Sequence, residues 1–122
     1  MGLQKYEELT VWQKAMDIAV EVYGLVKSLP SEELYVLSNQ MRRAAVSIPS
    51  NIAEGQERGT TKDFIKYLHI AKGSKAELET QLLICVRLDF LAQSQIQTAQ
   101  GLLAEVGKML NALIRSLSVK LA

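Results

Sequence analysis

Apolar residues recur at spacings of three and four along most of this chain, which is the period of an amphipathic α-helix. The stripes predict four helices, at residues 10–29, 31–56, 60–90 and 94–120. No stretch shows the strict alternation of a β-strand, and no segment repeats. The last predicted helix has the most regular heptad pattern, formed by Ile96, Ala99, Leu103, Val106, Leu110, Leu113 and Leu117.

Polar residues that favour helix ends divide these stripes. A threonine or serine followed three residues later by glutamine or aspartate predicts helix starts at Thr10, Thr60 and Ser94, and Pro30 with Ser31 separates the first two helices. Gly55 and Gly59 are expected to end the second helix. Because short connections join long helices, neighbours should run antiparallel. We therefore predict an all-α, single-domain, up-down-up-down four-helix bundle over residues 1–122.

The second helix contains Pro49, which is unusual. Proline inside a helix removes one backbone hydrogen bond and clashes with the preceding turn, at a cost of about 3 kcal/mol. We expect Ser47, Ser50 and Asn51 to relieve the broken ladder through local side-chain hydrogen bonds.

The third helix has one misfit in its apolar seam, Lys75. A buried, unpaired ammonium is costly, so this lysine should extend to solvent, pair with Glu79, or lie where the seam opens. The small Gly73 and Ser74 beside it would permit close approach of a neighbouring helix.

Apolar residues beside the seams make two stripes wider than one bundle core needs. The surplus predicts an oligomer interface, with chance exposure of some leucine as the alternative. These residues are Leu83 and Ile84 in the third helix and Leu102, Met109 and Ile114 in the fourth.

Composition adds a local charge bias. The chain has 122 residues and a formal net charge of +1, but residues 42–75 hold seven bases and three acids. Arg42 and Arg43 are adjacent, and about 100° apart on a helix, so at least one should face solvent. A second basic sector on the third helix is free of acids. The candidate nucleic-acid contacts are therefore Arg42, Arg43, Lys62, Lys66, His69 and Arg87.

Two alternatives to nucleic-acid contact remain open for these bases. They could form a solvated helix face with locally uneven charge, or they could pair within the protein with Glu54, Glu57 or Asp63; neither alternative requires a partner. Rings that would stack bases are scarce, because Tyr67 and Phe64 are the only ones near the lysines.

Catalytic and metal-binding patterns are missing from the sequence. The only histidine, His69, follows Lys66 where a bundle metal site would place glutamate, and the only cysteine, Cys85, lies in an apolar run typical of a core. We therefore expect no metal, no cofactor and no enzyme activity. No signal segment or membrane span is evident, so the expected location is the bacterial cytoplasm.

Three segments, Leu9–Met16, Gln40–Gly55 and Gly73–Leu82, together resemble the bacterial four-helix bundle proteins encoded in intervening sequences of 23S ribosomal RNA genes. The resemblance implies a homopentamer that associates with RNA. It extends binding roles no further than Arg42 and Arg43, and Lys75 departs from the apolar residue expected in its segment.

A more distant resemblance is to the accessory variability protein of diversity-generating retroelements, a pentameric bundle that associates with a reverse transcriptase and with nucleic acid. It implies an alternative function, a scaffold that recruits a protein partner without binding nucleic acid directly. Structured RNA or DNA, a protein partner and further copies of the chain are thus the expected partners.

Overall fold

The structure is a computed structural model that describes residues 5–121. Four α-helices account for most of this range: α1 (Thr10–Val26), α2 (Leu37–Glu57), α3 (Thr61–Arg87) and α4 (Gln93–Val119). Two short 3₁₀ helices, η1 (Tyr6–Glu8) and η2 (Ser31–Glu33), precede α1 and α2. The described range has no strand. The prediction of an all-α fold with four helices is confirmed.

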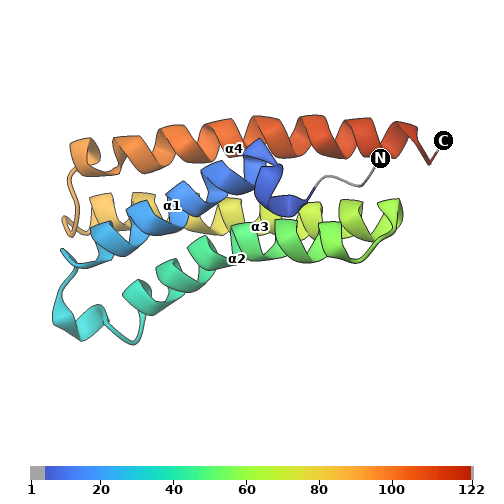
Figure 1. The fold of residues 1–122 in the computed structure, drawn as a ribbon. Helices are drawn as coiled ribbons and strands as arrows, with labels where there is room; N and C mark the ends of the chain where they lie inside the picture. The colour runs from blue at the N-terminus through green and yellow to red at the C-terminus, as the bar shows by residue number, and fades with distance from the viewer. Residues whose placement is uncertain (1–4, 122) are drawn as a thin grey trace.

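The helices lie side by side, and the chain reverses direction at each connection (Figure 1). α1 packs against α2 and α4, α2 packs against α3, and α3 packs against α4. α1 and α3 do not contact each other, so they occupy diagonal corners of the bundle. Their outer faces consequently point in different directions.

The core is built from the predicted stripes. All four helices contribute fully buried side chains, and the largest are Ile18, Met41, Ile48, Ile52, Leu68, Leu78, Leu82, Ile96, Leu103 and Leu110. Cys85 belongs to this core, with its Sγ 3.6 Å from Met41 Sδ. Burial raises the pKa of the Cys85 thiol, which disfavours the reactive thiolate and suits a packing role.

The predicted start of the second helix at residue 31 is wrong. Residues Ser31–Glu33 form the 3₁₀ helix η2, and α2 begins only at Leu37. Val36 has φ −117° and ψ −97°, a conformation that interrupts the helix although the apolar spacing of Leu34 and Leu37 continues through it. Leu34, which continues the apolar spacing before α2, is 44% exposed. The first helix is also shorter than predicted and ends at Val26.

The predicted helix signals have mixed outcomes. The backbone N–H of Asp63 donates to Thr60 Oγ1 at 3.1 Å, which confirms that cap. Thr10 and Ser94 are not caps, because they lie inside their helices, whose N-caps are Leu9 and Ala92. Gly59, with φ +86°, ends α2 as predicted, whereas Gly55 lies inside α2.

Pro49 is buried inside α2. The side chain of Asn51 donates to the carbonyl oxygen of Ser47 at 2.8 Å and to Ser47 Oγ at 2.9 Å. These are local bonds of the predicted kind, but they satisfy the carbonyl and hydroxyl oxygens of Ser47. Pro49 instead leaves the carbonyl oxygen of Ala45, four residues earlier, without its helical donor.

We expect Pro49→Ala to fold, with a straighter α2 and a free energy of unfolding raised by about 1 kcal/mol, because one backbone hydrogen bond to Ala45 is regained. Chemical denaturation measures the change, and amide exchange at residue 49 detects the new bond. A variant that fails to fold would mean that the kink is required for packing.

Candidate nucleic-acid interface

The arginine pair diverges from α2. Arg42 is half-buried, with its guanidinium 5.9 Å from the ring centroid of Tyr23 and its Nη2 3.5 Å from the carbonyl oxygen of Leu34. Arg43 is exposed. Both also border a shallow depression between α1 and α2, together with Val46. The prediction that at least one arginine faces solvent is confirmed.

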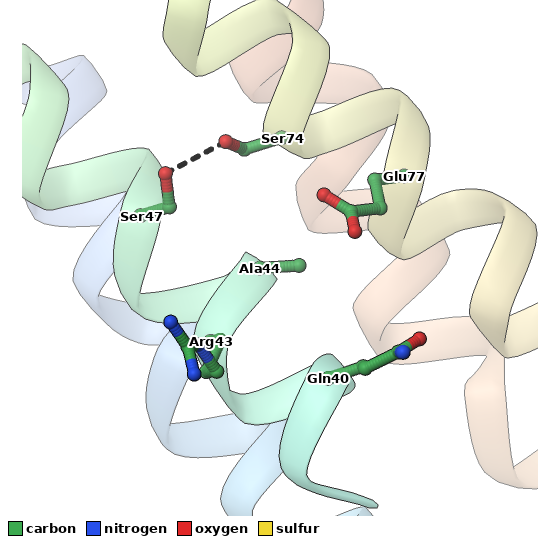
Figure 2. A pocket seen from close by; sticks show the side chains of 6 residues that line it. All are labelled: Gln40, Arg43, Ala44, Ser47, Ser74 and Glu77. Carbon is green, nitrogen blue, oxygen red and sulfur yellow. Dashed lines mark hydrogen bonds between the residues drawn. The ribbon is translucent and has the colours of Figure 1, made fainter. Parts of the chain in front are cut away.

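Arg43 also lines a polar groove between α2 and α3, with a volume of about 440 Å³ (Figure 2). In this groove Gln40 extends from α2 toward α3, and Glu77 extends from α3 toward α2. The Oγ atoms of Ser47 and Ser74 are 2.7 Å apart and bridge the two helices. The groove therefore combines a free cation and hydroxyls with a carboxylate, which is a mixed site and not a purely anion-binding one.

We expect Ser47→Ala to lower the free energy of unfolding by about 1 kcal/mol, because it leaves the largely buried Ser74 hydroxyl and one Asn51 donor without their partner. The double variant, Ser47→Ala with Ser74→Ala, should lose less free energy of unfolding than the two single variants lose together. Chemical denaturation of the two single variants and the double variant measures this coupling. Strictly additive values would contradict the bridge.

The four predicted bases of α3 are all exposed on one side of the helix: Lys62, Lys66, His69 and Arg87. They do not form one patch. Lys62 and Arg87 are about 37 Å apart along the axis at 1.5 Å per residue. Between His69 and Arg87 the same sector is mostly uncharged, with Gly73, Ala76, Thr80, Leu83 and Ile84, and the exposed Glu77 lies at its edge. Three bases thus cluster near the start of α3, and the fourth lies alone at its end.

Arg87 has apolar surroundings. It borders the same depression as Leu83, Ile84 and Val86. Leu83 is 49% exposed and Ile84 is 40% exposed. A guanidinium beside exposed aliphatic side chains suits a protein interface better than a phosphate contact.

The alternative of internal charge pairing finds no support among the described residues. None of the six predicted bases makes a salt bridge there; Glu54 instead pairs with Arg58 at 3.0 Å. That hydrogen bond raises the pKa of Arg58. Arg58 also donates to the Tyr67 hydroxyl, and Lys66 Nζ lies 5.9 Å from the Tyr67 ring centroid. The six bases remain available to an external partner.

Lys75 is accommodated by a neighbouring glycine. Its Nζ donates to Glu79 Oε2 at 3.0 Å, one of the predicted solutions. The aliphatic stem passes over Gly107 of α4, where an added Cβ would lie 2.5 Å from Lys75 Cε. Gly73, by contrast, is exposed and has no neighbour within 4 Å of such a Cβ, so it does not mediate close approach within the bundle.

The predicted surplus of apolar surface is only partly exposed. Leu102, Met109 and Ile114 of α4 are partly buried against the core, whereas Leu83 and Ile84 of α3 are exposed. Sequence reasoning missed a different stripe on α1. Met16, Val20 and Tyr23 are 40%, 73% and 47% exposed. Their spacing of four and three residues was the available signal.

Other site types have little support in the described part of the chain. No group of three or more His, Cys, Asp or Glu residues there could hold a metal ion. None of its helices is long and apolar enough to cross a membrane.

The comparisons with known proteins agree with the first of the two resemblances, the one to proteins of 23S rRNA intervening sequences. The model of a family described as 23S rRNA-intervening sequence protein matches residues 7–112. The chain belongs to this family. A solved structure from Bacteroides thetaiotaomicron, described as a protein of unknown function from the S23 ribosomal protein family, is 30% identical. The match covers 86% of this chain and 98% of that chain, with a TM-score of 0.79. No curated protein matches significantly.

The groove of Figure 2 joins two of the segments that carry the family resemblance. Gln40, Arg43 and Ser47 come from the segment Gln40–Gly55, and Ser74 and Glu77 come from Gly73–Leu82. Within this 23S rRNA-intervening sequence protein, these segments thus build both the serine bridge between α2 and α3 and part of the surface around the arginine pair.

Proposed function

We propose that the protein is a non-enzymatic, homo-oligomeric bundle of the bacterial cytoplasm that contacts structured RNA through its basic residues. The observation that carries this proposal is that five of the six predicted bases are exposed, with Arg42 half-buried, and that none has an acid partner among the described residues. Arg43 and the cluster Lys62, Lys66 and His69 would make the phosphate contacts, with Arg42 beside them. Arginine suits bidentate phosphate contact, and lysine adds attraction at longer range.

A single chain has a formal net charge of only +1, so assembly would bring several weak basic sites together on one particle. Two exposed apolar patches support self-association: Met16, Val20 and Tyr23 on α1, and Leu83 and Ile84 on α3. α1 and α3 are diagonal, so the patches face different ways. The α1 patch of one copy can then contact the α3 patch of the next copy. A series of such head-to-tail contacts that returns to the first copy forms a ring. We propose a pentamer, as the family resemblance implies.

Binding of a structured RNA hairpin to the nuclease-treated protein tests this function. We expect binding at low salt that weakens steeply near physiological salt, because phosphate contact releases counterions. The variant Arg42→Glu with Arg43→Glu should bind about tenfold more weakly, since two charge-assisted contacts are reversed. Fluorescence anisotropy measures both effects.

A matched control carries the same charge change on another face: Lys108→Glu with Arg115→Glu, both exposed on α4. Its loss of affinity should be clearly smaller. Equal losses in the two variants would mean that only net charge matters, and affinity that does not change with salt would contradict phosphate contact altogether.

A second function is favoured by the setting of Arg87. Its neighbours Leu83 and Ile84 form an exposed apolar patch that a protein partner could cover. In this alternative the bundle is a scaffold that recruits another protein, and its complex survives nuclease digestion. A complex that disappears on digestion would favour the RNA-contact function.

A further inference from the structure

A second groove lies where α1 ends and α2 begins, beside the 3₁₀ helix η2, and it has a volume of about 520 Å³. One side is apolar, formed by Val26, Leu29 and Pro30. The other side is polar and includes Lys27, Ser38 and Arg42. This groove is distinct from the one between α2 and α3, because the two share no lining residue.

The charged residues that line the groove are both cationic. They are Lys27, at the end of α1, and Arg42. No carboxylate lines it, and the two acids of η2, Glu32 and Glu33, are not among the lining residues. Neither cation makes a salt bridge within residues 5–121. Arg42 uses one N–H on the carbonyl oxygen of Leu34 and keeps further donors for a ligand.

Ser38 adds an unsatisfied donor to this side. Its residue is only 3% exposed, it lines the groove, and its hydroxyl has no hydrogen-bond partner in the described part of the chain. The only fully enclosed side-chain oxygen without a partner in residues 5–121 is Gln81 Oε1, so Ser38 Oγ is open to the groove, where a ligand oxygen can accept its hydrogen bond. This observation is independent of the charges.

The start of α2 provides further donors at the same place. Its N-cap, Val36, offers no side-chain acceptor. The first-turn amides of Leu37, Ser38 and Asn39 have no acceptor among the described residues. Free amides at a helix N-terminus attract an anion, and of these three residues Ser38 lines the groove together with Lys27 and Arg42.

We propose that this groove binds a phosphate monoester with a flat body, such as a 5′-nucleotide. The phosphoryl group accepts from Arg42, Lys27, Ser38 and the first turn of α2. A dianion with three terminal oxygens matches this number of donors better than a carboxylate does. The base rests on the apolar side formed by Val26, Leu29 and Pro30. The nucleotide is either free or the 5′ end of an RNA strand.

Calorimetric titration with AMP, adenosine and inorganic phosphate tests the proposal. AMP should bind saturably, phosphate more weakly, and adenosine most weakly. Ser38→Ala and Lys27→Gln should each weaken AMP binding about tenfold. Lys108→Gln, an exposed lysine of α4, is the control for lost charge and should bind AMP as the parent does. Lys27 is exposed, so its variant should fold even if Ser38→Ala does not.

Absence of AMP binding at millimolar concentration would overturn the proposal, as would equal affinity in the parent, Ser38→Ala and Lys27→Gln. Short RNA strands with 5′-phosphate and 5′-hydroxyl ends then distinguish the two sources. Tighter binding of the phosphorylated strand than of AMP assigns an RNA end, and tighter binding of AMP assigns a free nucleotide. Lys27 and Ser38 take no part in the RNA contact proposed above, so either proposal can fail alone.

Discussion

Replacing Gly55 with alanine should lower the free energy of unfolding by about 3 kcal/mol, the upper end of the usual cost of overpacking. An added Cβ would lie 2.6 Å from Tyr67 Cβ and 3.4 Å from the carbonyl oxygen of Phe64. Both atoms are fixed by the backbone of α3, so α2 and α3 must separate to make room. Chemical denaturation monitored by circular dichroism measures the loss.

Two other helical glycines are matched controls for this change. Gly101→Ala on α4 meets no atom within 4 Å and should raise stability by up to about 1 kcal/mol, the difference in helix propensity. Gly107→Ala meets only the flexible end of Lys75 and should fall between the two. If all three variants gain stability, α2 and α3 do not approach closely at Gly55.

Gly55 also illustrates what periodicity omits. The sequence suggested that this glycine ends the second helix, because glycine is a common terminator. Its actual role is to let α3 approach α2, and that role depends on a residue of another helix. The stripe predicted which side of each helix is buried. It carried no information on where along the axis two helices come closest.

The same reasoning explains the outcome for the basic residues. Helical spacing predicted that Lys62, Lys66, His69 and Arg87 share an exposed side, and they do. The residue numbers also place Arg87 far along the axis from Lys62, and the predicted apolar surplus at Leu83 and Ile84 lies beside it, but the sequence analysis treated these two features separately. The groove at Ser38 was not foreseen, because it depends on the break at Val36, where apolar spacing continues through a non-helical backbone.

Introducing one charge on either apolar patch should convert the proposed pentamer into monomers. Val20 is 73% exposed and Leu83 is 49% exposed, so Val20→Glu and Leu83→Glu should leave the fold of the single chain intact. In the assembly, each would bury a carboxylate against an apolar partner, which is costly. Light scattering gives the mass, and circular dichroism verifies the helix content. Ala112→Glu, at an exposed position of α4, should remain assembled.

Mixing the two variants distinguishes the geometry of the contact. If the α1 patch of one copy meets the α3 patch of the next, each variant keeps one intact patch, and an equimolar mixture should form heterodimers joined by one native contact. Such a dimer cannot grow, because both of its outer patches are altered. If each patch paired with itself, Val20→Glu alone would abolish the α1 contact and mixing would change nothing.

RNA binding should follow the assembly. Several weak basic sites on one particle bind a structured RNA together, so dissociation into monomers should reduce affinity by roughly 10²–10⁴-fold although no base is altered. The charge reversal at Arg42 and Arg43 should instead reduce affinity at unchanged mass. Monomeric Val20→Glu that binds RNA as well as the parent does would mean that one chain carries the whole site, and the ring would then have no role in binding.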